Sequence, residues 1–101
     1  MSTYSSEFEK GYDDGEANQR GSDPEPSQDE ISLFTVDYRL GFVTGWVSAF
    51  GAGLAFKMAS VAGDKAREYG LTDVDKLIKE LALTDAEHKK MVKDDFNYKP
   101  E

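Results

Sequence analysis

Aromatic residues recur at every fourth position in the middle of the chain. The row consists of Phe34, Tyr38, Phe42, Trp46 and Phe50. Small residues form a second row with the same spacing, at Gly41, Gly45, Ala49 and Gly53. Because residues four apart lie on one side of a helix, the two rows occupy adjacent faces of a single helix. The pattern predicts a long central helix, which Asp29 would cap and Gly70 would close.

The rest of the chain divides around this helix, and the resulting fold class is all-α in a single domain. Pro24 and Pro26 interrupt any helix that would join the two ends of the chain. Near the C-terminus, Leu-Thr-Asp occurs twice, and Thr72 and Thr84 are predicted to cap two short antiparallel helices. The predicted division is an acidic N-terminal helix in 1–20, a Pro-containing linker in 21–30, the central helix in 31–70, a helical hairpin in 71–96 and a tail in 97–101.

The central pattern has a copy near the N-terminus. "FEKGYDDG" and "YRLGFVTG" share the order aromatic-x-x-Gly-aromatic-x-x-Gly, thirty residues apart. Each glycine inside a helix costs about 1 kcal/mol relative to alanine, so a packing gain is expected to offset it. The alternative is that aromatic residues and glycines coincide here by composition. The residues predicted to let another helix approach closely are Gly11, Gly15, Gly41, Gly45, Ala49 and Gly53.

An apolar central helix must be buried by other segments, by a copy of itself, or by lipid. Residues 40–56 contain no charged residue and approach the shortest length that spans a bilayer. Rows of small residues four apart are also used by helices that associate in membranes, as in a glycine zipper. Lys57 and the polar character of the rest of the chain favour burial within protein. A single-span membrane protein is kept as an alternative.

Composition narrows the environment and the partners. The chain has 101 residues, a net charge of −8 and no cysteine, which excludes disulfides and thiolate chemistry. A nucleic-acid-binding protein normally carries a basic surplus, so the acidic balance disfavours nucleic acid and favours basic protein partners. The first residues are polar and acidic rather than those of a secretory signal, which predicts a cytoplasmic location.

No arrangement of residues predicts catalysis. His88 is the only histidine and lies in a charged helical pattern without a nucleophile motif nearby. The adjacent acid pairs Asp13–Asp14 and Asp94–Asp95 point to different sides of a helix, so neither converges on a metal or a proton. No calcium loop or phosphate-binding loop is present in the sequence. We therefore expect no enzyme activity, no metal and no cofactor.

Two segments resemble a known family. "KGYDDGEANQRG" followed by "YRLGFVTGW" is similar to the ribosome modulation factor family, in which an RGYxxGxxG-type segment precedes a WxxGW segment. Gly11, Tyr12 and Gly15 match the first segment. The second segment fits in two registers, one at Tyr38-Gly41-Phe42 and one at Phe42-Gly45-Trp46. The resemblance covers residues 8–46 and implies a ribosome-associated factor.

These observations predict a small, acidic, non-enzymatic interaction protein. It would bind a protein partner or a copy of itself as a homo-oligomer, in the manner of accessory, inhibitor or assembly proteins of phage type. Aromatic side chains dominate interface energetics, so Phe42, Trp46 and Phe50 are the predicted partner-binding residues. For Phe42, burial in the core is the competing interpretation.

Overall fold

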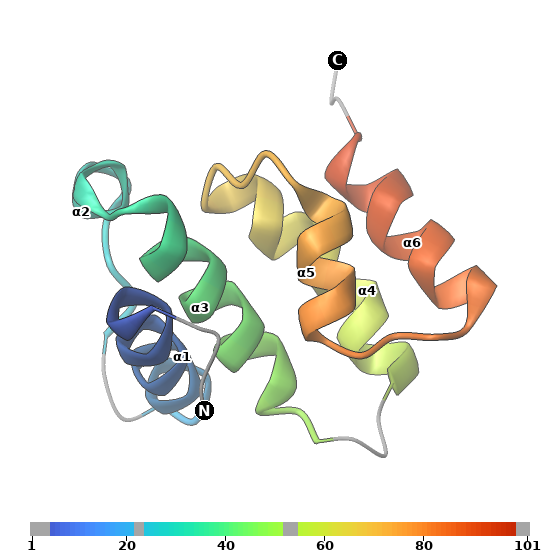
Figure 1. Cartoon of the computed structure of the whole chain (residues 1–101), viewed down its shortest axis with the longest axis horizontal. Coiled ribbons are helices and arrows are strands. Elements are labelled where there is room, and N and C mark those ends of the chain that lie inside the picture. Colours follow the sequence, from blue (N-terminus) through green and yellow to red (C-terminus); the bar gives the residue numbers. More distant parts are fainter. Residues whose placement is uncertain (1–4, 22–23, 52–54, 99–101) are drawn as a thin grey trace.

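The computed structural model describes residues 5–21, 24–51 and 55–98 (Figure 1). The helices are α1 (Ser6–Gln19), α2 (Gln28–Leu33), α3 (Val36–Ser48), α4 (Ala55–Glu68), α5 (Val74–Glu80) and α6 (Ala86–Phe96). These described residues contain no strand. The predicted all-α fold class is confirmed.

The helices form two pairs that meet where α3 contacts α4 (Figure 1). In the first pair, α1 and α3 run parallel, because Gly11 faces Tyr38 and Gly15 faces Phe42. In the second pair, α4 and α6 also run parallel, with Phe56 beside His88 near their starts. Within each pair, the chain returns from the end of the first helix to the start of the second through a short helix. This helix is α2 in the first pair and α5 in the second.

The central helix predicted over residues 31–70 is wrong: this stretch contains the end of α2, all of α3 and α4. The first break lies at Phe34, whose ψ of 147° is extended, and at Thr35, whose hydroxyl caps α3 by accepting the Tyr38 N–H at 3.1 Å. The second follows Ser48, and Gly51 has φ +99°, a left-handed conformation that favours glycine. The four-residue spacing of the rings does not reveal these breaks. It depends on which side chains share a helix face, whereas the breaks depend on backbone capping.

The caps lie one or two residues from their predicted places. Ser27, not Asp29, begins α2 through a capping box with Glu30, whose N–H lies 3.2 Å from the serine hydroxyl. Asp73 and Asp85, rather than the threonines before them, cap α5 and α6. A carboxylate accepts backbone N–H groups more strongly than a hydroxyl, so aspartate takes the cap where both are adjacent. Gly70 follows α4 with φ +68°, as expected of it.

The core lies between α3, α4, α5 and α6. Val43, Val47, Leu77 and Val92 are fully buried, one or two from each of three helices. Tyr69 joins the two halves of the molecule, because its ring stacks on Phe42 of α3 with centroids 4.8 Å apart and an interplanar angle of 18°. The first pair contributes to this core mainly through α3, since Phe8 is the only hydrophobic residue of α1 that is buried.

The single-span alternative depended on one continuous helix through residues 40–56. Instead, α3 ends at Ser48 and α4 begins at Ala55, so these residues do not form one helix. Within the described ranges, none of the helices combines the length and the apolar character needed to cross a bilayer.

Candidate functional site

The closest contact between elements is the glycine-lined contact of α1 with α3. A Cβ built on Gly11 or Gly15 would lie under 3.0 Å from backbone atoms of α3, and one built on Gly41 or Gly45 would lie equally close to the backbone of α1. The relation is reciprocal: Gly11 faces Tyr38, and Gly41 faces Phe8, which is the equivalent residue of the other copy. The two sequence copies thus form a pair with local pseudo-two-fold symmetry. The groove on α3 is occupied by α1.

Polar bonds hold the outer edge of this pair. The Ser5 hydroxyl donates to the Asp37 carboxylate at 2.8 Å, and the Tyr38 hydroxyl donates to the Asp14 carboxylate. Burial, together with the neighbouring Asp14 charge, raises the pKa of Tyr38 above its usual range, so the phenol remains a donor.

The row of small residues does not continue past this contact. Ala49 is the C-cap residue of α3 and is half-buried, while Gly53 lies outside the described residues. Because α3 ends at Ser48, the predicted four-residue series cannot extend along one face beyond that residue. The close approach is limited to the four glycines of the two sequence copies.

The three predicted partner-binding rings do not form one surface. Phe42 is 3% exposed and belongs to the core, which is the alternative kept open for it. Trp46 and Phe50 are half-buried and meet edge to face, with ring centroids 5.4 Å apart. Lys65 Nζ lies 4.3 Å from the Trp46 ring centroid, so this ring already makes a cation–π contact within the chain.

Lys65 is a buried cation that the sequence pattern does not reveal. Its side chain is 8% exposed and forms ion pairs with Glu25 of the linker and, at 3.5 Å, with Glu68. The hydrogen bond from Lys65 lowers the pKa of Glu25, while burial raises the pKa of Glu68. A buried charge needs such partners, and the pairing ties the linker to α4. Glu25 and Lys65 are forty residues apart, so no local spacing could have predicted this cluster.

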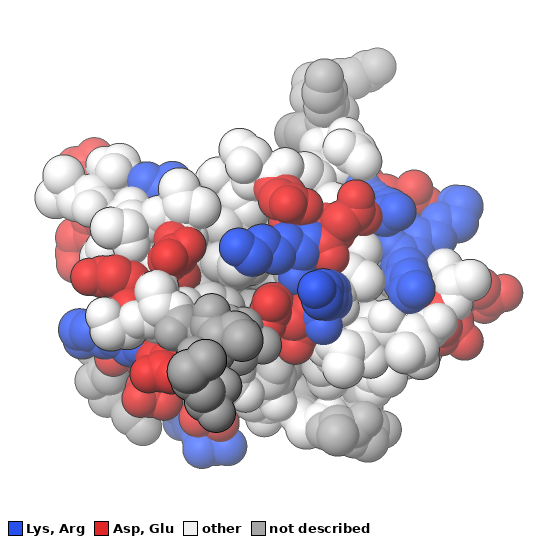
Figure 2. All heavy atoms as spheres, viewed as in Figure 1, with Lys and Arg blue, Asp and Glu red and all other residues white. Residues whose placement is uncertain are grey.

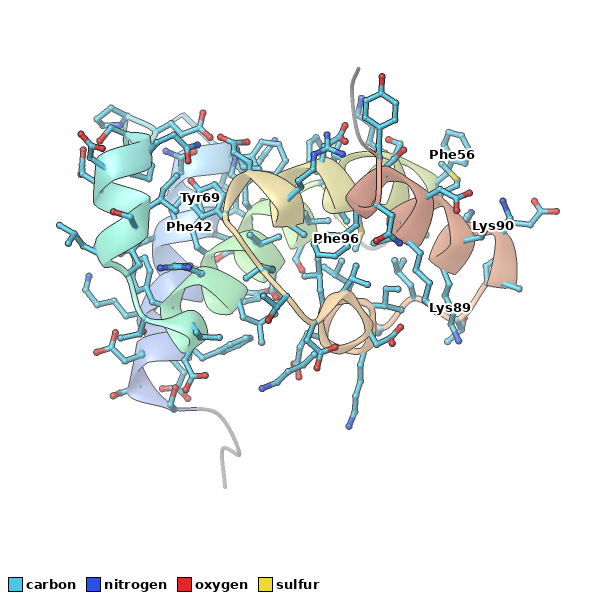
Figure 3. The ribbon with its side chains drawn as sticks, turned by 90° about the horizontal axis from the view of Figure 1, so that it is seen from above. Phe42, Phe56, Tyr69, Lys89, Lys90 and Phe96 are labelled. Carbon is cyan, nitrogen blue, oxygen red and sulfur yellow. The ribbon has the colours of Figure 1, made fainter. Side chains whose placement is uncertain are left out.

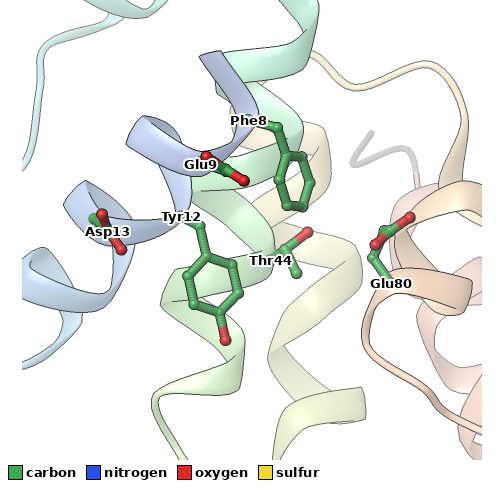
Figure 4. Close-up of a pocket in the computed structure, with 6 residues that line it drawn as sticks. All are labelled: Phe8, Glu9, Tyr12, Asp13, Thr44 and Glu80. Carbon is green, nitrogen blue, oxygen red and sulfur yellow. The ribbon is translucent and has the colours of Figure 1, made fainter. Parts of the chain in front are cut away.

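A cleft lined by acidic and aromatic residues opens beside α1. It has a volume of about 360 Å³ and is lined by Phe8, Glu9, Tyr12, Asp13, Thr44 and Glu80; we call it the acidic cleft (Figure 4). Figure 4 shows the rings of Phe8 and Tyr12 extending from α1, with Glu80 reaching in from α5. The Thr44 hydroxyl donates to the Leu40 carbonyl at 2.7 Å, so its proton is already used in a hydrogen bond within α3. Carboxylate and aromatic side chains thus line the same cleft.

The chemistry of the acidic cleft suits a cation. Carboxylates attract a positive charge, and the faces of aromatic rings add cation–π attraction. None of the described residues that line the cleft is a lysine or an arginine. Among the residues that the structure describes, no three histidine, aspartate or glutamate side chains are grouped to hold a metal ion. An organic cation can use both the carboxylates and the rings of this lining.

The α1 side of the surface is mostly acidic, whereas α5 and α6 carry charges of both signs. Figure 2 shows many of the visible lysine and arginine side chains over α5 and α6, and mostly acidic ones over α1. Lys10 of α1 pairs with Asp14 at 3.2 Å, and Arg20, the C-cap residue of α1, pairs with Glu16 at 3.4 Å. Both bases are thus paired with acids of the same segment, in which acids outnumber bases.

No known protein family, curated protein or solved structure was found to match this chain. The similarity to ribosome modulation factors therefore stays a prediction carried by the two short motifs. The acidic cleft could not be predicted from them, because Glu80 reaches it from α5, far along the sequence.

Proposed function

We propose that this protein is a non-enzymatic interaction protein that binds a basic segment of a protein partner in the acidic cleft. One observation carries the proposal: Glu9, Asp13 and Glu80 come from two helices to one cleft that Phe8 and Tyr12 also line. A lysine or arginine side chain would place its charge near the carboxylates and its methylene groups against the rings. This combination of apolar wall and opposite charge matches both parts of such a side chain.

The size of the acidic cleft agrees with this ligand. Its volume of about 360 Å³ lies at the lower end of the usual 300–1,000 Å³ for ligand sites. That space accommodates one or two side chains of a peptide and not a folded domain. A cation–π contact at a partly exposed site contributes about 0.5–1 kcal/mol. We therefore expect weak binding of a single residue, with affinity built up by several basic residues.

The glycine-lined contact is not proposed as the binding surface. Binding of a partner or a second copy to the α3 groove would first require α1 to leave, since α1 fills it. The acidic cleft demands no such rearrangement, because it is open in the folded chain. Self-assembly through the glycines is thus less favoured than peptide binding beside them.

The test is a calorimetric titration of the protein with a short arginine-rich peptide. We expect Asp13→Asn combined with Glu80→Gln to weaken binding by about tenfold, which corresponds to 1.4 kcal/mol. The matched control is Asp29→Asn combined with Glu87→Gln, which removes the same charge from exposed positions outside the cleft. The control variant should retain at least half of the affinity.

Two results would overturn the proposal. Equal loss in both double variants would mean that net charge alone attracts the peptide. Co-sedimentation of the protein with ribosomes in moderate salt, unchanged by Asp13→Asn combined with Glu80→Gln, would favour the ribosome-associated alternative.

A further inference from the structure

A second pocket adjoins the acidic cleft. It has a volume of about 360 Å³, and its lining includes Tyr12 of α1, Ser48 of α3, Met58 of α4, and Leu81 and Leu83 just after α5. None of its described lining residues is charged. We call it the apolar pocket. Its lining thus contrasts with the carboxylates of the acidic cleft.

Three elements pass from the acidic cleft to the apolar pocket. Tyr12 of α1 lines both. On α3, Thr44 lines the cleft, and Ser48, one helical turn further on, lines the pocket. At the end of α5, Glu80 lines the cleft, and the next residue, Leu81, lines the pocket. Cleft and pocket are therefore the two halves of one groove.

The apolar pocket can be reached from outside the molecule. Tyr12, Ser48 and Ala55 of its lining are half-buried, so each keeps part of its surface open to water. Phe56, the neighbour of Ala55 in α4, does not line the pocket. Its ring is 65% exposed and lies at the outer edge of the molecule in Figure 3. A ligand side chain in the pocket would therefore remove apolar surface from water.

We propose that this groove binds an extended peptide segment in which an aliphatic residue lies two positions from a lysine or arginine. The inference rests on the proposed function, because the acidic cleft holds the basic residue. The aliphatic side chain enters the apolar pocket, whose uncharged lining favours it. The partner is thus a basic segment with an aliphatic residue at a fixed spacing, and not any basic segment.

The distance between the two halves of the groove sets this spacing. Thr44 and Ser48 are four residues apart in α3, which corresponds to about 6 Å along the helix axis. In an extended chain, side chains two positions apart point to the same side and are separated by about 7 Å. Adjacent side chains point to opposite sides, so a neighbouring aliphatic residue would miss the pocket. A short peptide does not hold a helix in water, so the extended form is the relevant one.

The experiment is an NMR titration of the intact protein with three capped peptides. In Ac-Leu-Gly-Arg-Gly-Leu-NH2, leucines lie two positions from the arginine on both sides, so the peptide can bind in either direction. Ac-Gly-Leu-Arg-Leu-Gly-NH2 has the same composition but places the leucines next to the arginine. Ac-Gly-Gly-Arg-Gly-Gly-NH2 has no leucine. We expect the first peptide to bind about five- to tenfold more tightly than the other two, because one leucine is buried.

The positions of the shifted signals show where each peptide binds. The backbone N–H signal of Glu80 should shift with all three peptides, because each offers an arginine to the acidic cleft. The signals of Ser48 and Leu83 should shift strongly with the first peptide only.

A larger side chain in the apolar pocket provides the second test. Ser48→Phe places a ring at a residue that lines the apolar pocket and not the acidic cleft. This variant should bind the first peptide no more tightly than the peptide without leucine, and its affinity for the latter should not change. Ser60→Phe is the matched control at another half-buried serine, which lines neither half of the groove. The control variant should keep the preference for the first peptide.

The possible failures have distinct meanings. Equal affinity for the three peptides, weakened in each case by Asp13→Asn combined with Glu80→Gln, would overturn this inference and leave the acidic cleft as the binding site. Absence of binding by all three would overturn both proposals. If Ac-Leu-Gly-Gly-Gly-Leu-NH2 bound as tightly as the first peptide, or if the Ser48 and Leu83 signals moved with protein concentration alone, the pocket would take an apolar segment or a second copy. Either result would overturn the inference.

Discussion

The two parallel helix pairs solve the same packing problem in different ways. In α1–α3, four glycines bring the two backbones together reciprocally. In α4–α6, Gly63 alone permits a comparable approach, since a Cβ there would lie under 3.0 Å from the Val92 carbonyl oxygen, the Phe96 N and the Asp95 Cβ. Helix α4 also buries the small residues Ala59, Ala62 and Ala66. The first pair thus brings backbone to backbone at four glycines, whereas the second pair does so at one.

The difference shows how each terminal helix is retained. Each terminal helix buries one hydrophobic residue, Val92 in α6 and Phe8 in α1, but α6 also contacts α5 as well as α4. Helix α1 buries one hydrophobic residue, Phe8, and its main contact is α3 alone. Its attachment therefore depends on dispersion between closely spaced backbones and on a few polar bonds. The first pair therefore has four positions at which an added side chain would meet the backbone of its partner helix, and the second pair has one.

The largest expected effect comes from Gly41→Ala combined with Gly45→Ala. Each Cβ would clash with the backbone of α1, at a cost of about 1–3 kcal/mol, and alanine returns about 1 kcal/mol through its helix propensity. The net loss in the free energy of unfolding should be about 3 kcal/mol for the pair, measured by urea denaturation with circular dichroism.

A matched alanine substitution checks that this loss arises from the contact. Lys10→Ala changes an exposed residue of α1 and should alter the free energy of unfolding by at most about 0.5 kcal/mol. If the double glycine variant were as stable as Lys10→Ala, the backbone contact would not hold the first pair together.

Gly63→Ala should have a smaller effect in the second pair. Only one Cβ is added instead of two, and it would meet the Val92 carbonyl and the Asp95 side chain. We expect a loss of about 1.5 kcal/mol in the free energy of unfolding, again by urea denaturation. A loss equal to that of the double variant would contradict the contrast drawn between the pairs.

The smallest effect is expected at Glu25, which lies in the linker between α1 and α2 and pairs with Lys65 of α4. Glu25→Gln removes one ion-pair partner of Lys65, while Glu68 remains. Because the Glu25 side chain is 46% exposed, the loss in the free energy of unfolding should be only about 0.5–1 kcal/mol at neutral pH.

The pH dependence of that difference has a definite sign. Pairing lowers the pKa of Glu25 below its usual 4.5, so its contribution is complete above that pH. As the pH falls through the lowered pKa of the folded protein, the contribution is lost. The unmodified protein and Glu25→Gln should therefore converge in stability in acid. A difference that grew on acidification would mean that Glu25 is not stabilised by Lys65.

Parts of this architecture were accessible from the sequence. The repeated motif places glycines and rings at matched positions, and such periodicity reports which residues share a helix face. It did not report where helices break, because Thr35 acts through its own backbone conformation and hydroxyl. It also missed the acidic cleft and the Lys65 cluster, since Glu80 and Glu25 reach them from distant segments. Such sites depend on tertiary placement rather than local order.

The reciprocal contact of α1 with α3 also limits how this protein can vary. At most interfaces, a residue that grows on one side can be accommodated by a residue that shrinks on the other. Here the atoms opposite Gly11, Gly15, Gly41 and Gly45 belong to the main chain. No substitution can shrink a carbonyl group, so a second mutation elsewhere has nothing to remove. We expect searches for suppressors of a glycine variant to recover reversion and not compensation.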